Sequence, residues 1–230
     1  MAMKKKKGRG ISWLKLLLEL LVVFAGVTAG FLLNNLREER VNREVEHIYL
    51  ENLMSNLTAD SIEITNHIAA NRNNVEISRR AVESFGDDGI SADLALGALS
   101  VMVTYNDISL QDATYQSIVG SGNLGKISDV EFRMQLIAYY QFLDQVRTVE
   151  TVHNDYISTY VLPFVMKNMD MTAGRLIENF DPNGIEFKNL TGGYYVLENQ
   201  KMDMSLELEA LNAQLKIRLK SKLETNLKSN

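Results

Sequence analysis

Histidine and carboxylate side chains at helical spacing could hold a metal ion, and the chain offers one such group. His47 and Glu51 stand four residues apart beside Glu46, so they share a face if the segment is a helix. The chain has three histidines, His47, His67 and His153. Their positions do not match a metal-binding spacing such as His-Glu-x-x-His. Charge-rich helices produce such pairs routinely. We therefore favour a solvated surface, with no metal and no cofactor.

A glycine-rich segment suggests nucleotide chemistry at first sight. Residues 120–125 spell Gly-x-Gly-x-x-Gly, the string of dinucleotide-binding turns. Such a turn needs a strand before it and a helix that opens at the glycines, so that backbone N–H groups meet the pyrophosphate. Here the preceding sequence is helix-like and the next candidate helix cap is Ser128. We interpret the segment as a tight connection between helices that offers an interaction loop at Gly120, Ser121, Gly122 and Gly125.

The absence of cysteine and of one hydrolase motif excludes two further kinds of chemistry. The chain has no cysteine, so it has no thiolate nucleophile, no disulfide and no cysteine-ligated zinc or iron–sulfur site. It also lacks the Gly-x-Ser-x-Gly turn that presents the nucleophile of many hydrolases. No combination of residues nominates a catalytic set, and we expect a protein that is not an enzyme.

Charge is divided unevenly along the chain. The net charge is −5, yet the first 36 residues hold six basic residues and one acidic residue. Nucleic-acid binding requires Lys and Arg clustered over the main surface, where they neutralise phosphates. A basic head on an acidic body therefore predicts no nucleic-acid partner.

The elements that must position these side chains begin with an apolar segment after the basic head. Residues 16–33 contain no proline and, at about 1.5 Å per residue, span roughly 27 Å as a helix, close to the hydrocarbon thickness of a bilayer. Six Lys and Arg precede the segment, against Arg37, Arg40 and Arg43 after it. This asymmetry predicts a single-pass protein of the bacterial inner membrane, with its N-terminus in the cytoplasm and its body in the periplasm.

A cleaved signal peptide is the alternative interpretation of this segment, because the small residues at 27–29 resemble a processing site. The apolar run is long for a signal peptide and contains Glu19. The sequence also continues as a helix beyond the small residues. We therefore favour a transmembrane helix.

One face of this helix gathers the residues that suit contact with protein. Lys15, Glu19, Gly26 and Gly30 fall within about 60° of one another on a helical wheel, with Ala29 beside them. Small residues let helix backbones approach closely, and a carboxylate is costly against lipid, so this face favours an oligomerisation or docking surface. The alternative is that Glu19 pairs weakly with Lys15 and is hydrated at the membrane edge. A third and more specific hypothesis is that Glu19 takes part in proton or ion conduction across the membrane.

The charged sequence after the span continues as a helix and enters the body. We divide the chain into a basic cytoplasmic head (1–10), a transmembrane helix (11–35), a long juxtamembrane helix (36–86) and the remainder of a helical bundle (87–230). Polar residues at Ser61, Asn71 and Ser78 interrupt the apolar stripe of the juxtamembrane helix, which favours a bundle over a tight zipper. The stripe comprises Leu50, Leu53, Leu57, Ile64, Ile68, Val75, Val82 and Phe85.

Capping signals predict the helices that follow. Ser91 is an N-cap for a short helix that ends near residue 105, and a second short helix covers residues 110–119. Ser128 and Glu131 have the spacing of a capping box that starts a long helix, which Pro163 should kink or end. We place the inner face of that helix at Val130, Met134, Leu136, Ile137, Tyr140, Leu143, Val146, Tyr156, Tyr160 and Phe164.

The last part of the chain reads as a turn, a small hairpin and a final helix. Two short apolar runs around Gly192 and Gly193 predict a β-hairpin near 185–197. Leucines spaced mostly by four residues then predict an amphipathic helix to the end. The fold class is therefore mainly α, with one N-terminal transmembrane helix that continues into an antiparallel helical bundle.

Several of these motifs occur together in a known family. They are Leu18, Glu19, Val23, Gly26, Phe31 and Asn34-Asn35 before Arg37-Glu-Glu-Arg40, and then Tyr115, Ser121-Gly122-x-Leu124, Leu136 and Tyr139-Tyr140. The sequence resembles an uncharacterised bacterial family of single-span membrane proteins, a domain of unknown function with a Glu-containing transmembrane helix and an exported helical domain. The resemblance covers the span, the emerging helix and the middle of the body. The resemblance implies the single-span topology and a functional role for Glu19. It does not imply any enzymatic reaction.

We expect a non-enzymatic scaffold or accessory subunit of a membrane assembly. Its partners would be the lipid bilayer and either other membrane-protein subunits or further copies of itself. The alternatives are an exported ligand-sensing domain that acts through a partner, and conduction that involves Glu19.

Overall fold

The computed structural model describes residues 13–86 and 89–228, so the basic head at 1–10 lies outside the described residues. The chain divides into two units, Met1–Ile48 and Tyr49–Asn230. The element order is α1, α2, α3, η1, α4, η2, α5, β1, β2 and α6, which confirms the mainly α fold class.

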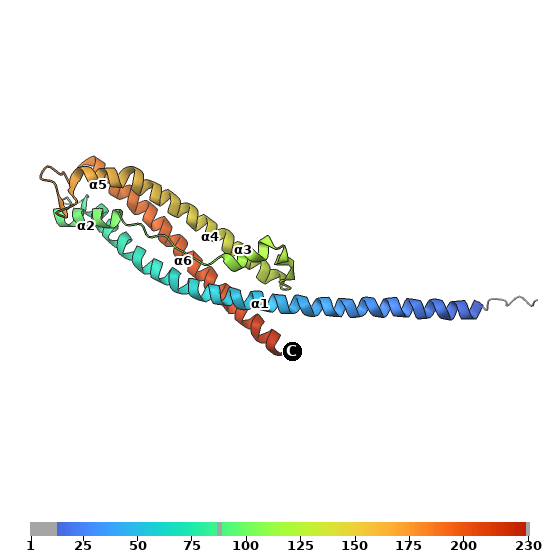
Figure 1. Cartoon of the computed structure of the whole chain (residues 1–230). Coiled ribbons are helices and arrows are strands. Elements are labelled where there is room, and N and C mark those ends of the chain that lie inside the picture. Colours follow the sequence, from blue (N-terminus) through green and yellow to red (C-terminus); the bar gives the residue numbers. More distant parts are fainter. Residues whose placement is uncertain (1–12, 87–88, 229–230) are drawn as a thin grey trace, which may run out of the picture. The chain divides into compact units, whose positions relative to one another are not determined.

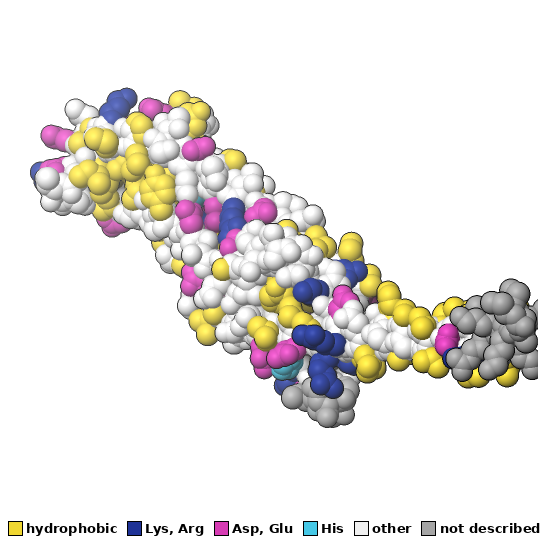
Figure 2. All heavy atoms as spheres, turned by 45° about the vertical axis from the view of Figure 1, so that its right-hand side comes forward, with side chains coloured by type: hydrophobic (Ala, Val, Ile, Leu, Met, Phe, Trp, Pro, Cys, Tyr) yellow, Lys and Arg dark blue, Asp and Glu magenta, His cyan; other side chains and the backbone are white. Residues whose placement is uncertain are grey.

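Helix α1 (Trp13–Ser84) supplies all the described residues of the first unit. Its side chains at 13–41 are exposed, and Figure 2 shows apolar side chains along this part of the helix. By length and composition, α1 is long and apolar enough near the N-terminus to cross a membrane. This agrees with the predicted span at 11–35, of which residues 11 and 12 lie outside the described part.

The second unit is built on three long helices: α1 from Tyr49 onward, α4 (Val130–Tyr156) and α6 (Ile185–Lys228) (Figure 1). The Asn212 amide donates to the Leu57 carbonyl (3.1 Å) and to the Tyr139 hydroxyl (3.3 Å) at one level. At a second level Glu198 contacts both Asn74 and His153. Helix α6 therefore runs antiparallel to both partners, whereas α1 and α4 run in the same direction.

Buried residues alternate by three and four along all three helices, the spacing of a coiled-coil seam. The seam of α1 comprises Leu50, Leu53, Leu57, Asp60, Ile64, His67, Asn71, Asn74, Ser78 and Ala81. That of α4 comprises Phe132, Leu136, Tyr139, Leu143, Val146, Glu150 and His153. That of α6 comprises Phe187, Thr191, Tyr194, Glu198, Lys201, Ser205, Leu208, Asn212, Leu215 and Leu219.

Polar seam residues divide the core into two apolar clusters. One cluster surrounds Leu57, Leu136 and Leu215, and the other surrounds Leu99 and Phe187. The second cluster includes the short helices α2 (Ala92–Met102) and α5 (Leu162–Asn168). Polar side chains of all three long helices occupy the stretch between the clusters.

The predicted short helices are present with shifted ends. Ser91 caps α2 as predicted, since its hydroxyl accepts from the Leu94 N–H (3.3 Å). Helix α2 ends at Met102 and α3 (Ala113–Gly120) begins three residues later than predicted. The reason is the connection at 103–112, which has neither helix nor strand from 104 to 111 and buries Ile108 and Leu110. The chain then passes through the 3₁₀ turn η1 (Asn123–Lys126) into α4.

The start of α4 corrects the predicted capping box. Asp129 is the N-cap, because its carboxylate accepts from the Phe132 N–H (2.9 Å), and Ser128 precedes it. The predicted inner face of the helix is also wrong at three positions, where the side chains are 59–60 % exposed: Val130, Met134 and Tyr160. The seam runs instead through Phe132 and Tyr139, which are fully buried.

Pro163 interrupts the long helix, as predicted. Helix α4 ends at Tyr156, and the π-helical turn η2 (Ile157–Val161) leads into α5, which carries the proline in its first turn. The Leu162 N–H donates to Ile157, five residues back. The wider turn lies directly before the proline, which has no N–H to donate.

The predicted hairpin at 185–197 is wrong, because these residues are the start of α6. Phe187, Thr191 and Tyr194 bury one helical face there, and the tight packing requires Gly193. A Cβ at Gly193 would collide with the Tyr156 hydroxyl. The only strands among the described residues are β1 (Met169–Asp170) and β2 (Arg175–Leu176), which pair antiparallel around Gly174 with φ +62°.

Candidate functional site

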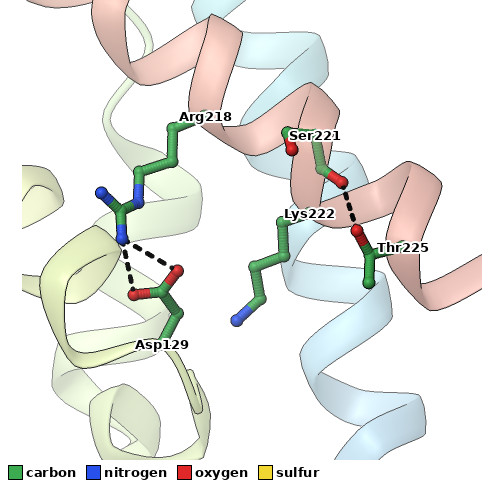
Figure 3. A pocket seen from close by; sticks show the side chains of 5 residues that line it. All are labelled: Asp129, Arg218, Ser221, Lys222 and Thr225. Atoms are coloured by element: carbon green, nitrogen blue, oxygen red, sulfur yellow. Dashed lines mark hydrogen bonds and ion pairs between the residues drawn. The ribbon is translucent and has the colours of Figure 1, made fainter.

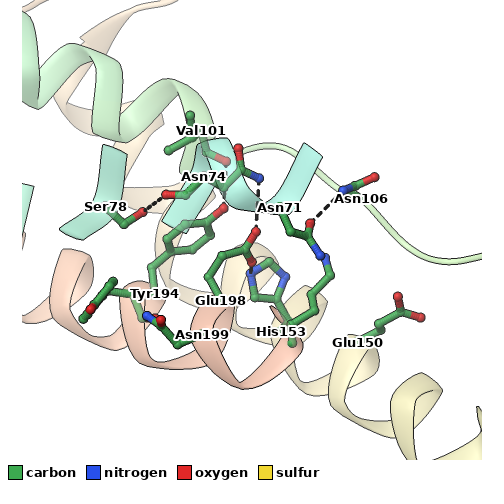
Figure 4. Close-up of polar contacts among 12 residues, drawn as sticks. Asn71, Asn74, Ser78, Val101, Asn106, Glu150, His153, Tyr194, Glu198 and Asn199 are labelled. Carbon is green, nitrogen blue, oxygen red and sulfur yellow. Dashed lines mark hydrogen bonds and ion pairs between the residues drawn. The ribbon is translucent and has the colours of Figure 1, made fainter. Parts of the chain in front are cut away.

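The most unusual chemistry in the bundle is a set of buried polar side chains that we call the polar layer. It consists of seven seam residues: His67, Asn71 and Asn74 from α1, Glu150 and His153 from α4, and Glu198 and Lys201 from α6. Figure 4 labels five of them: Asn71, Asn74, Glu150, His153 and Glu198. Each of the seven is at most 6 % exposed. Heptad spacing turns these side chains inward, so the sequence itself delivers ionisable groups into the core.

Glu198 is the centre of one half of the polar layer. Its Oε1 accepts from the Asn74 amide (3.1 Å), and its Oε2 lies 2.8 Å from His153 Nε2. Burial raises the pKa of the Glu198 carboxyl, but His153, Lys201 and Asn74 together outweigh burial and hold the pKa below its usual value. Glu198 is therefore a buried carboxylate that its neighbours keep charged.

Glu150 is the centre of the other half. Its Oε1 accepts the Ile108 N–H (2.7 Å) and lies 3.8 Å from His67 Nε2. Burial raises the pKa of the Glu150 carboxyl to about 7, and Asp107 adds to the rise. The Ile108 N–H and the positive charges of Lys201 and Arg147 oppose the rise without cancelling it.

His67 is held neutral beside Glu150. Burial and the positive charge of Lys201 lower the pKa of His67 to about 4. The neutral ring accepts from the Asn71 amide at Nε2 (2.8 Å), and the Asn71 carbonyl in turn accepts from Asn106 (2.7 Å). The His67 and Asn71 side chains therefore form a chain of hydrogen bonds that reaches the 103–112 connection.

The polar layer has the composition of a structural network more than of a reaction centre. The buried Lys201 acts electrostatically on both Glu150 and Glu198, while its Nζ has no hydrogen-bond partner among the described residues. In residues 13–86 and 89–228 no three His, Asp or Glu side chains could together hold a metal ion. Buried ionic groups are best documented as devices that fix the register of packed helices.

Sequence reasoning missed the polar layer although a signal was available. The apolar stripe predicts Asn71 and Ser78 as polar seam positions, whereas the metal-ligand spacing considered for His67 and His153 says nothing of their place in a seam. Strict alternation by three and four residues through Asp60, His67 and Asn74 would have shown that the polar residues belong to the seam.

A surface hollow of about 430 Å³ lies where α6 passes the start of α4, lined by Asp129, Arg218, Ser221, Lys222 and Thr225 (Figure 3). Arg218 contacts Asp129 (3.1 Å) and Glu131 (2.8 Å), and the Lys222 ammonium donates to the Ser128 hydroxyl (3.1 Å). Both cationic side chains already contact groups of this chain. These contacts connect α6 to the start of α4.

The residues predicted for membrane-helix packing all lie in α1 with exposed side chains: Lys15, Glu19, Gly26, Ala29 and Gly30. Apart from the adjoining backbone of α1, a Cβ at Gly26 or Gly30 would meet no atom of the described residues within 4 Å. The described part of the chain therefore gives no packing reason of its own for glycine at these two positions.

The residues of the predicted interaction loop form a short folded turn. Gly120 ends α3, the Ser121 hydroxyl donates back to the Ser117 carbonyl (2.7 Å), and Gly122 adopts φ +69°. Gly125 lies in η1. A helix and not a strand precedes the glycines, so the geometry lacks what a dinucleotide turn requires.

Comparison of the chain with protein-family models, with curated proteins and with solved structures found no match in any of the three. The similarity to single-span membrane proteins of unknown function therefore stays a prediction.

Proposed function

We propose that the protein is a single-pass, membrane-anchored helical scaffold or accessory subunit, and that one face of its span docks a partner in the membrane. The observation that carries this proposal is the exposed face with Glu19, Gly26 and Gly30 on a helix apolar enough to cross a bilayer. A carboxylate in hydrocarbon is costly without a partner, and glycines expose backbone for close helix contact.

The proposed topology follows from the flanking charges. The N-terminus lies in the cytoplasm, the span lies in the bacterial inner membrane and the bundle lies in the periplasm, because basic residues concentrate before the span. The partner in the membrane is another subunit or a second copy of the chain. The lipid bilayer surrounds the apolar face opposite Glu19.

The bundle supports a mechanical role for the exported part. Its polar layer is buried from solvent, and Glu198 of α6 lies 2.8 Å from His153 of α4 within it. Breaking one partner of such a network is costly, so the three helices are held in one register. A body with a fixed helix register suits a subunit that must hold its shape within an assembly.

Cysteine crosslinking in native membranes tests this proposal. The chain has no cysteine, so Asn34→Cys supplies a single crosslinking site at the C-terminal end of the predicted span. In that background, Glu19→Leu or Gly26→Ile should reduce crosslinked product several-fold, because a bulky or apolar side chain removes the close, polar contact.

Phe24→Leu serves as the matched control, since Phe24 lies on the opposite face of the helix. It should leave the crosslinking yield unchanged. Equal yields in Glu19→Leu, Gly26→Ile and the control would rule out docking through this face.

A further inference from the structure

The connection between α2 and α3 is an unusual element, which we call the strap and define as residues 103–112. Between the turn at Val103 and the N-cap residue Asp112 it has neither helix nor strand, and it runs along the bundle (Figure 1). Ile108 is 6 % and Leu110 7 % exposed, while the residues between and beside them face solvent. Two buried anchor side chains therefore hold ten residues of irregular backbone against the long helices.

Polar groups of the bundle fasten the strap at two backbone positions. Glu150 of α4 accepts the Ile108 N–H (2.7 Å), and Asp60 of α1 accepts the Gln111 N–H (2.8 Å). Both carboxyl groups belong to residues that are at most 4 % exposed. An irregular segment is thus held by two acids that folding has removed from water, an arrangement that is sensitive to their protonation.

Three side-chain contacts supplement this fastening. Asn106 donates to Asn71 (2.7 Å), and Asn154 donates to Asp107 (2.7 Å). Arg147 Nη1 lies 2.9 Å from Asp112 Oδ2. The last two pairs are partly exposed, so the two buried acids distinguish the strap from an ordinary surface loop.

Every element packed around Glu150 contributes a titratable or charged group. His67 faces it from α1 at 3.8 Å, Lys201 from α6, Asp107 from the strap and Arg147 from α4. Burial outweighs the two cations, so the pKa of Glu150 rises to about 7, and burial raises the pKa of Asp60 to about 6. The closed strap therefore holds a proton on Glu150 more tightly than water-exposed glutamate would.

We propose that the strap is a pH-responsive closure over the polar layer: loss of the Glu150 proton shifts the strap toward an open state, and its return shifts the strap back to the closed state. This goes beyond the docking role of the span. Loss of the proton places a negative charge in the closed core, and opening of the strap admits water to that charge. The conformational step is local, because the three long helices keep their own seams.

The size of the effect follows from linkage. If opening returns the Glu150 carboxyl from a pKa of about 7 to the ordinary value of 4.5, the population of the open strap rises about tenfold between pH 6 and pH 8. Asp60, with a pKa of about 6 against 3.8, adds about a factor of two over the same interval.

Hydrogen exchange of the full chain in lipid nanodiscs tests the proposal. Protection of the strap peptides, corrected for the intrinsic exchange rate, should fall about tenfold from pH 6 to pH 8, while protection of seam peptides in α4 stays high. Glu150→Gln keeps an oxygen for the Ile108 N–H and cannot ionise, so its strap should lose most of this pH dependence. Glu207→Gln, at an exposed position of α6, should behave as wild type.

A pH-independent strap in the wild-type chain, or an equal pH dependence in Glu150→Gln, would overturn the proposal. A second measurement avoids any substitution at Glu150. Leu110→Cys places one thiol under the strap and Ser109→Cys places one on its outer side. The ratio of their maleimide-labelling rates should rise several-fold from pH 6 to pH 8, and a constant ratio would contradict opening.

Discussion

Glu198 neutralises buried positive charge in the polar layer, so its removal should be among the costliest single changes in the bundle. Glu198→Ala leaves Lys201 and His153 without their carboxylate, and an uncompensated buried charge costs roughly 3–5 kcal/mol. Urea unfolding of the full chain in mild detergent, followed by circular dichroism, would measure the loss. Glu207→Ala on the exposed side of α6 should change the free energy of unfolding by no more than about 0.5 kcal/mol.

Glu150 should make the stability of the bundle depend on pH in the direction opposite to a salt-bridged acid. The folded protein holds the Glu150 proton up to a pKa of about 7, whereas the unfolded chain releases it near 4.5. The free energy of unfolding therefore falls as pH rises from 4.5 to 7, by at most roughly 3 kcal/mol, and this contribution is constant above pH 7.

His67 acts in the opposite sense, since its pKa falls from 6.5 to about 4 and its contribution is lost as pH falls through that interval. Thermal melts of wild type and Glu150→Gln at several pH values isolate the Glu150 contribution. The stability difference should grow in favour of Glu150→Gln as pH rises from 4.5 to 7. A pH-independent difference would show that the acid is not buried as described.

At the scale of elements, the start of α4 distinguishes the observed cap from the one expected from sequence. Asp129→Ala removes the acceptor of the Phe132 N–H and one partner of Arg218, so it should cost about 1 kcal/mol or slightly more. Ser128→Ala should cost less than half as much. Urea unfolding of the two variants compares them directly, and a larger loss in Ser128→Ala would restore the predicted capping box.

The two adjacent glycines of α6 provide a second test of element packing. Gly193→Ala places a methyl group against the Tyr156 hydroxyl, and the forced shift should cost about 1–3 kcal/mol. Gly192→Ala meets no atom within 4 Å and adds a better helix former, so it should stabilise by about 0.5–1 kcal/mol. Thermal unfolding of both variants would measure the contrast. Equal effects of the two substitutions would contradict the close approach.

Sequence patterns predicted those elements whose signals are local. The Ser91 cap, the interruption at Pro163 and the long apolar helix near the N-terminus all follow from residues that are neighbours in the chain. The segment at 185–197 failed because paired glycines resemble a turn, whereas the reason for Gly193 is Tyr156, which is distant in sequence. Long-range packing of this kind leaves no local signal.

The polar layer was only partly predictable for the same reason. Its seam positions can be read from the spacing of His67, Asn71 and Asn74. Which charges face one another depends on the parallel course of α1 and α4 and the opposite course of α6. The direction of α4 relative to α1 depends on the return of the chain through the strap. No local sequence pattern predicts this return.

At the scale of the whole molecule, the proposed function gives each unit one task. Under this proposal the first unit would present Glu19 and its neighbouring glycines for docking within the membrane, and the buried charges of the second unit would fix the helix register of the bundle. Assembly should therefore depend on the span and not on the polar layer. Substitutions in the span should weaken association without changing the melting temperature of the bundle.

Native mass spectrometry of the full-length protein, gently extracted from its own membranes, would test whether the chain docks a partner through its span. We predict a discrete assembly, either a homo-oligomer or a stable complex with other subunits, that dissociates to the single chain in Glu19→Leu while Phe24→Leu preserves it. A wild-type protein that is extracted only as a single chain, or an assembly that survives Glu19→Leu unchanged, would contradict docking through the span.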